Sequence, residues 1–184
     1  MKATGVVRRI DDLGRVVIPK EIRKIHRIKE GDPLEIFTDS DGEIILKKYS
    51  PIGELSEFAT SYAETISKTT GHITCITDKD TVIAVSGGSK KDFLEKNLSK
   101  ELEEIIENKE VYKSKENEEI AVPITLGEGR ERIDNSQVVY PIVSEGDPIG
   151  SVVILAKDRT KKFSDVESKV AESAANFLGT HLEI

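Results

Sequence analysis

The sequence predicts two domains: a small, mainly β N-terminal domain over residues 1–50 and a larger α+β sandwich with flanking helices over residues 51–184. Charge separates them, because residues 1–50 carry 11 basic and 9 acidic side chains whereas residues 51–184 carry 16 basic and 25 acidic. The first part has short β-branched runs between turn residues, and the second combines such runs with longer helical periodicity. Between them, Ser50 can cap and Pro51 can open a helix. These observations place a domain boundary near residue 50.

The first domain is expected to begin with two strands and a short helix. Residues 4–10 alternate and are rich in β-branched side chains, and an Asp-Asp-Leu-Gly turn at 11–14 leads into the strand-like run at 15–18. Pro19 ends that run and suits the first position of a helix of about ten residues. The apolar face of the helix is expected to consist of Ile22, Ile25 and Ile28.

Two further strands complete the first domain. They are LEIFT at 34–38 and EIILKKY at 43–49, and the Asp41-Gly42 pair between them is a strong hairpin signal. The predicted order is therefore β-β-α-β-β. A domain of this size buries only a small core, so one copy leaves apolar strand faces uncovered. We expect the domain to dimerise for this reason.

The second domain is predicted to have the order α-β-β-α-β-β-β-α around an antiparallel sheet. Its expected elements are a helix over about 51–70, strands HITCIT and TVIAVS, a helix over about 90–108, a run EIAVPIT, a hairpin over 138–158 and a helix capped by Ser164. The first and last helices carry apolar residues at spacings of three and four. That spacing fits pairing between the two helices, pairing across a dimer axis, or packing on the sheet, and the sequence leaves all three open.

Positive charge in this acidic chain is concentrated near the N-terminus. Through Lys29 there are nine basic and three acidic side chains, although the whole chain has a formal net charge of −7. A basic face on a small domain, attached to a long acidic body, is typical of a nucleic-acid binder with a separate regulatory or assembly domain. The alternative is an ordinary solvated face whose cations pair with Asp11, Asp12 and Glu21.

The stretch TGVVRRIDDLGRVVIPKEIR, followed by GDPLEIF and ILKKY, closely resembles the AbrB-type swapped-hairpin regulators. The helix-flanked second domain resembles a GAF domain, and the whole chain resembles transcriptional regulators of sporulation genes in spore-forming bacteria. The resemblance implies that two N-terminal domains interleave their hairpins into one barrel-like dimer. It also implies that basic residues of the first strand, the loop and the helix contact double-stranded DNA. These residues are Arg8, Arg9, Arg15, Arg23 and Lys24.

The chemistry of these side chains fits that role. Arg8 and Arg9 lie on opposite faces of a regular strand, so we expect unequal contributions from them. The guanidinium groups of Arg15 and Arg23 can form two-point contacts with phosphate oxygens or a guanine edge. Duplication of the cations in a dimer predicts steep salt dependence, with a slope of roughly −0.9 per phosphate contacted. No recognition helix of usual length is present, so readout is expected to depend on DNA shape as well as base edges.

The second domain is expected to add an association surface and not a catalytic site. Pairing of its terminal helices would join two dimers into a homotetramer, and the cleft of a GAF-like fold suits an unidentified small-molecule effector. The segment VSGGSKK lacks the glycine spacing of a Walker motif. His26, His72 and His181 have no metal-ligand spacing, and the paired carboxylates surround no nucleophile. We therefore expect no enzyme activity, cofactor or metal.

Two other functional classes stay open at this stage. An antitoxin-like protein would bind DNA through the same N-terminal fold and wrap a toxin with a disordered tail, but residues 51–184 have strand and helix periodicity. A ligand-sensing protein that never contacts DNA is the second alternative. The single cysteine, Cys75, excludes an intrachain disulfide, and no apolar run approaches membrane-spanning length. We expect a cytoplasmic, nucleoid-associated protein.

Overall fold

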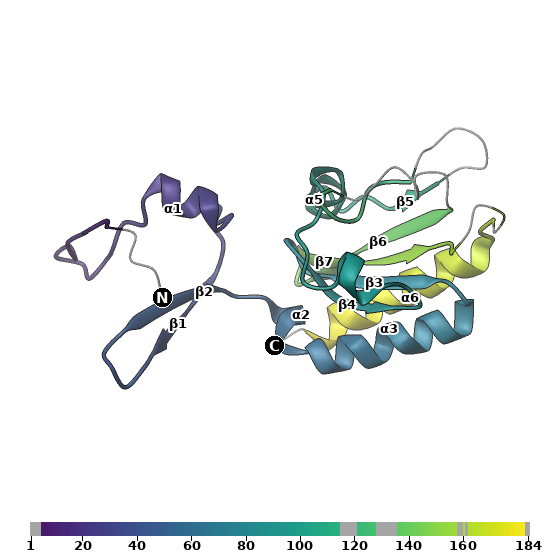
Figure 1. Cartoon of the computed structure of the whole chain (residues 1–184), viewed down its shortest axis with the longest axis horizontal. Helices are drawn as coiled ribbons and strands as arrows, with labels where there is room; N and C mark the ends of the chain where they lie inside the picture. Colours follow the sequence, from purple (N-terminus) through teal and green to yellow (C-terminus); the bar gives the residue numbers. More distant parts are fainter. Residues whose placement is uncertain (1–4, 115–120, 128–135, 158–159, 161, 183–184) are drawn as a thin grey trace. The chain divides into compact units, whose positions relative to one another are not determined.

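The computed structural model describes residues 5–114, 121–127, 136–157, 160 and 162–182, and the chain divides into two compact units between Tyr49 and Ser50 (Figure 1). The first unit contains α1 (Lys20–Ile25), β1 (Leu34–Thr38) and β2 (Ile44–Lys48). The second contains α2 (Pro51–Glu54), α3 (Ser56–Thr70), β3 (Ile73–Thr77), β4 (Val82–Ser86), α4 (Lys90–Phe93), α5 (Lys100–Glu107), β5 (Tyr112–Lys113), β6 (Gln137–Ser144), β7 (Asp147–Leu155) and α6 (Asp165–His181).

The predicted hairpin of the first unit is confirmed, whereas its helix is shorter than expected. β1 and β2 pair antiparallel from Leu34 with Lys48 to Thr38 with Ile44. The Asp39 carboxylate closes the turn by accepting hydrogen bonds from two backbone N–H groups in it. α1 has six residues, because the backbone turns left-handed at Arg27, where φ is +52°, and the N–H of Ile28 closes the end by donating to the Arg23 carbonyl.

The two N-terminal strands predicted at 4–10 and 15–18 do not form in one copy of the chain. Residues 5–10 and 15–18, which the structure describes, pair with no strand, and residue 4 lies outside the described residues. The turn between them does form, since the N–H of Asp11 donates to the Arg15 carbonyl and that of Gly14 to the Asp11 carbonyl. The sheet of this unit therefore has two strands and is not closed into a barrel. A strand needs a hydrogen-bonding neighbour, and a single copy supplies none here.

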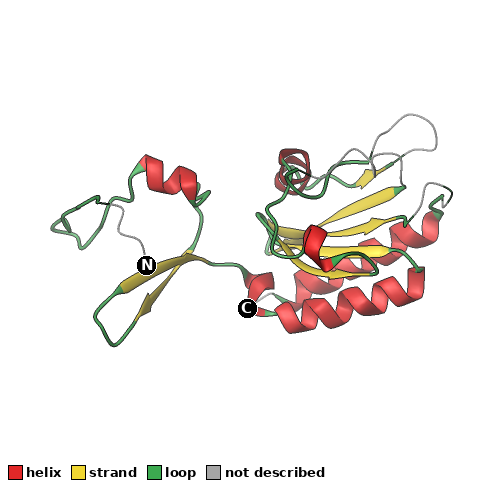
Figure 2. Ribbon diagram, in the orientation of Figure 1, coloured by secondary structure: helices red, strands yellow, loops and turns green. Residues whose placement is uncertain are grey.

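The second unit is built on a five-stranded antiparallel sheet in the order β4-β3-β7-β6-β5. Figure 2 shows the two long helices, α3 and α6, side by side on one face of this sheet, with α5 on the other. Each face has its own apolar core. The first core includes Ala63, Ile76, Val152 and Leu178, and the second includes Cys75, Phe93, Leu102 and Val153.

Three predicted elements of the second unit differ in detail. The first helix breaks at Leu55, which ends α2. The predicted helix over 90–108 divides into α4 and α5, because residues 95–98 instead hydrogen-bond to the start of β4, where the N–H of Val82 donates to the Lys96 carbonyl. The described part of the run EIAVPIT, residues 121–125, forms no strand beyond one isolated bridge. The Gln137 side chain holds this segment in place of strand pairing. Its Oε1 accepts the N–H of Val122 at 2.8 Å, and its Nε2 donates to the Val122 carbonyl at 2.9 Å.

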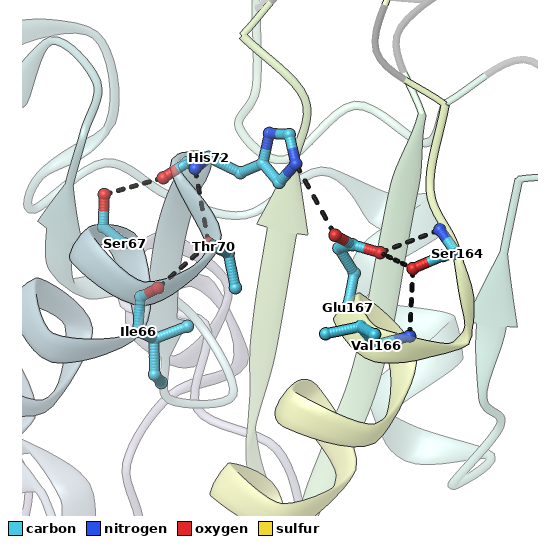
Figure 3. A network of polar contacts seen from close by, with 7 residues as sticks. All are labelled: Ile66, Ser67, Thr70, His72, Ser164, Val166 and Glu167. Carbon is cyan, nitrogen blue, oxygen red and sulfur yellow. Dashed lines mark hydrogen bonds and ion pairs between the residues drawn. The ribbon is translucent and has the colours of Figure 1, made fainter.

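A polar network joins the C-terminal end of α3 to the N-terminal end of α6 (Figure 3). The buried His72 ring places Nε2 3.8 Å from Oε1 of Glu167. The other oxygen of this carboxylate accepts hydrogen bonds from the N–H and Oγ of Ser164, both at 2.8 Å, which completes a capping box. The predicted Ser164 cap is therefore confirmed, and the network ties the cap of α6 to the start of β3.

The environment of Glu167 predicts a pH-dependent stability. Burial raises the pKa of its carboxyl group, but hydrogen bonds from Ser164 and the charge of His72 outweigh burial and leave the pKa below its ordinary value. Since the folded state then binds fewer protons than the unfolded state, this contribution is present at neutral pH and is lost as pH falls below the ordinary carboxyl range.

We expect the substitution Glu167→Gln to reduce the loss of stability between pH 7 and pH 3. Glutamine keeps the capping geometry but cannot ionise. Urea unfolding at both pH values, with Glu172→Gln on the exposed side of the same helix as control, measures the difference. An equal pH dependence in both variants would contradict the assignment.

Thr74, in the middle of β3, is fully buried, and its hydroxyl has no hydrogen-bond partner among the described residues. An unpaired buried hydroxyl costs about 1–3 kcal/mol, and valine replaces it with a methyl group of similar size. We expect Thr74→Val to raise the free energy of unfolding by about 1 kcal/mol. Thr77→Val is the matched control and should destabilise, because the Thr77 hydroxyl bonds Ser151. Chemical denaturation of both variants tests this, and a loss of stability in Thr74→Val would refute it.

Candidate nucleic-acid interface

The five basic side chains predicted to contact DNA lie on three successive segments of the first unit. Arg8 and Arg9 belong to the extended residues 5–10, Arg15 ends the turn, and Arg23 and Lys24 lie in α1. Four of them are exposed and Arg23 is half-buried. The expected opposition of Arg8 and Arg9 presumes a regular strand, which a single copy does not form. Both side chains remain accessible to solvent.

Arg15 is engaged within the turn. Its Nε donates to Oδ2 of Asp11 at 2.8 Å, and its backbone N–H donates to Oδ1 of the same carboxylate at 2.8 Å. The backbone N–H and then the side chain of Arg15 hold the pKa of Asp11 below its ordinary value. This pair fixes the turn, but the Arg15 side chain stays 69% exposed. A guanidinium group has five N–H donors, so pairing through Nε leaves it able to contact a phosphate.

An apolar groove of about 640 Å³ lies beside these cations within the first unit. Its lining residues are Val6, Arg8, Val16, Val17, Ile18, Pro19, Ile22, His26, Ile28, Leu46, Lys47 and Lys48. The groove brings Arg8, α1 and β2 together around one apolar surface. The predicted apolar face of the helix needs correction here, because Ile22 and Ile28 line the groove whereas Ile25 is 75% exposed.

Two lysines at the end of β2 were not predicted as part of this region. Lys47 places its ammonium group 4.7 Å from the centre of the Phe37 ring across the hairpin. Nζ of Lys48 lies 3.1 Å from Oδ2 of Asp32 and donates to the Arg27 carbonyl at 3.2 Å. The contact between Lys48 and Asp32 could have been predicted from the sequence. The predicted hairpin places residue 48 opposite residue 34, and Asp32 lies two residues before residue 34.

Comparison with known proteins assigns the chain to a family. Residues 54–183 match the family described as stage V sporulation protein T C-terminal, transcription factor. Over 183 residues the chain is 55% identical to stage V sporulation protein T of Bacillus subtilis (strain 168), and the alignment covers 100% of this chain and 99% of that protein. The chain belongs to the stage V sporulation protein T family.

Both parts of this family architecture have further relatives. Residues 7–54 match the family described as antidote-toxin recognition MazE, bacterial antitoxin. Over 51 residues the chain is 61% identical to the transition state regulatory protein AbrB of Bacillus subtilis (strain 168). This alignment covers 28% of this chain and 52% of AbrB. The GAF domain of the nutrient sensor CodY from Clostridium difficile has a TM-score of 0.51 at 15% identity, covering 67% of this chain and 83% of that chain.

These findings confirm the predicted fold classes and the functional class. The stage V sporulation protein T family consists of transcription factors, and this member joins an AbrB-like N-terminal unit to a GAF-like α+β unit. Within the described part of the chain, no helix has the length and apolar character needed to cross a bilayer.

Proposed function

We propose that this chain regulates transcription as an oligomer whose N-terminal units bind double-stranded DNA through Arg8, Arg9, Arg15, Arg23 and Lys24. The observation that carries the proposal is the position of these cations, four exposed and Arg23 half-buried, on consecutive segments of a unit that also contains an apolar groove. The pairing of Arg15 with Asp11 leaves its side chain mostly exposed, so it remains available to a phosphate. An arrangement of this kind suits a polyanionic duplex.

The occupant that we propose for the groove is the N-terminal unit of a second copy. The first unit contains no buried hydrophobic side chain among its described residues, and Val7, Leu13, Val17 and Ile36 are each at least 67% exposed. Among the described residues, the two-stranded sheet has no third strand, and the β-branched residues 5–10 and 15–18 join no sheet. Interleaving two copies would pair these strands, fill the groove, and duplicate each cation across a two-fold axis.

A salt titration of DNA binding tests this proposal. Fluorescence anisotropy with a labelled 30-base-pair duplex of mixed sequence measures the affinity of the full-length chain between 50 and 200 mM salt. A dimer that neutralises about six to ten phosphates should lose roughly 10³–10⁵ in affinity over this range. Affinity that does not change with salt would contradict an interface made by these cations.

The second unit supplies a surface for joining two such dimers into a tetramer. Aromatic rings of α3 and α6 contact one another: the ring of Phe58 lies 5.8 Å from that of Tyr62 and 6.1 Å from that of Phe177, measured between ring centres. His181 stacks on both phenylalanines at 5.7 and 5.1 Å. Phe177 is 44% exposed despite these contacts. We propose that the same aromatic surface of a second copy covers it.

Phe177→Ser should weaken this association between second units. Truncation of a central interface aromatic costs about 2 kcal/mol or more, which is about thirtyfold in affinity. Light scattering should then show dimers at protomer concentrations where the unmodified chain is tetrameric. Glu172→Ser, an exposed position on the same helix, should leave the tetramer intact. An unchanged mass for Phe177→Ser would show that the surface is not an interface.

We propose further that the GAF-like unit binds an unidentified small-molecule effector. We also propose that the protein associates with the nucleoid. The description of the CodY relative as a cofactor-binding GAF domain supports the first point. The antitoxin alternative receives less support, because the described residues after Tyr49 fold into a sheet covered by helices and do not form an extended tail. Thermal-shift measurements with a panel of amino acids and nucleotides would test for the effector.

A further inference from the structure

The helix that carries two of the proposed DNA contacts is too short to be stable by itself. α1 has six residues, and none of its side chains is fully buried. Isolated helices of fewer than about 12 residues are marginal in water. The helix ends at a backbone conformation that residues other than glycine seldom adopt, since φ of Arg27 is +52°. Contacts from outside α1 are therefore needed to hold the segment that carries Arg23 and Lys24.

Two side chains next to the β1–β2 hairpin supply such contacts. Nζ of Lys48, in β2, donates to the Arg27 carbonyl at 3.2 Å and lies 3.1 Å from Oδ2 of Asp32. The same carboxylate oxygen accepts the backbone N–H of Lys29 at 2.7 Å. The side chains of Lys48 and Asp32 are only 23% and 11% exposed, so solvent screens their attraction weakly. The pair thus fastens the backbone just after α1 to the hairpin.

The backbone that the pair holds is bonded in turn to the two helical cations. The N–H of Ile28 donates to the Arg23 carbonyl at 2.8 Å, and the N–H of Arg27 donates to the Lys24 carbonyl at 3.4 Å. Loss of the contacts at residues 27 and 29 is therefore expected to loosen the last turn of α1. All of these bonds lie within the first unit.

We propose that Asp32 and Lys48 are positioning residues for DNA binding, which hold the last turn of α1 so that Arg23 and Lys24 meet the duplex already ordered. The proposal rests on the proposed function and deepens it. A cation that is ordered beforehand loses less conformational freedom on binding, which raises affinity. Asp32 thereby favours the binding of a polyanion although its own charge repels phosphate. Charge alone predicts the opposite effect for an acidic side chain.

This difference in sign makes Asp32→Ala a sharp test. Fluorescence anisotropy of the full-length chain with a mixed-sequence duplex should show an affinity about fivefold lower, although the substitution removes a negative charge. Glu30→Ala makes the same change of charge at an exposed position two residues away. It should bind as tightly as the unmodified chain or more tightly. Unchanged or higher affinity for Asp32→Ala would overturn the positioning role.

A second comparison separates positioning from general damage to the first unit. In a chain that already carries Arg23→Ala and Lys24→Ala, Asp32→Ala should cause no further loss of affinity, because the cations that it positions are gone. Damage to the whole unit would also disturb Arg8 and Arg15. The same fivefold loss would then appear in this background, measured at 50 mM salt, and it would refute the proposal.

Hydrogen exchange without DNA distinguishes failure of this proposal from failure of the proposed function. Asp32→Ala should speed exchange about fivefold in a peptide covering residues 20–28 and leave residues 34–47 unchanged. If residues 34–47 also lose protection, Lys48→Met replaces Asp32→Ala in every comparison, since it removes the Nζ contacts and keeps an apolar stem. No change at 20–28 would overturn the holding of α1. An unmodified chain that binds no DNA would refute the proposed function, and exchange would still decide whether the pair holds the helix.

Discussion

Arg23→Ala is expected to reduce the affinity of the full-length chain for duplex DNA by about tenfold to a hundredfold. Arg23 is the half-buried arginine of α1, so its side chain is partly ordered before DNA binds. A dimer loses two such groups, and the salt slope should fall by about two units if each contacts one phosphate. Anisotropy titrations at several salt concentrations measure both quantities.

The control for this substitution is Lys169→Ala, which removes one exposed positive charge from α6 in the second unit. It should leave the affinity and the salt slope within error of the unmodified chain, because Lys169 does not belong to the proposed DNA interface of the first unit. Equal losses in both variants would mean that general charge, and not the α1 surface, governs binding. Retention of full affinity by Arg23→Ala would remove this residue from the interface.

Gly150→Ala is expected to destabilise the second unit by about 3 kcal/mol. Gly150 is buried in β7, and a β-carbon at this position would overlap the backbone carbonyl of Thr77 and lie 2.8 Å from Cδ1 of Ile52. The carbonyl belongs to the adjacent strand and cannot move without disturbing the sheet. Relief of the overlap therefore requires separation of β3 and β7 or displacement of α2.

Gly71→Ala separates this effect from ordinary backbone strain. Gly71 ends α3 with φ of +75°, and a β-carbon there would meet nothing within 4 Å. The left-handed conformation alone should cost about 1 kcal/mol. Urea unfolding followed by circular dichroism, at fixed protomer concentration, compares the two variants. A smaller loss for Gly150→Ala than for Gly71→Ala would contradict the close approach of β3 and β7.

Local patterns predicted the second unit well where the determinants lie within a few residues. Ser164 signalled the cap that begins α6, and the strand runs at 72–77 and 81–86 contain β3 and β4. The prediction failed where distant residues intervene. Helical spacing continued through 94–99, but hydrogen bonds to the start of β4 hold that segment in another conformation. Propensity is a weak prior where tertiary contacts compete with it.

In the first unit, the strands and the contacts of individual cations could not be predicted, for a different reason. The β-branched residues 5–10 and 15–18 have the composition of strands, yet strand formation depends on a neighbour that one copy lacks. The basic segment could be located by counting charged residues along the sequence, without any knowledge of the structure. The contacts of individual cations, such as Arg15 with Asp11 and Lys48 with Asp32, depend on turn and hairpin geometry that composition does not contain.

A hydrogen-exchange footprint of the full-length chain, with and without a saturating mixed-sequence duplex, tests the central claim most directly. The claim is that the paired N-terminal units present one cationic surface to DNA. Peptides covering residues 5–18 and 19–25 should then gain protection, whereas the exposed faces of α3 and α6 should be unchanged. Protection confined to the second unit, or none at all under conditions where DNA is bound, would contradict the account.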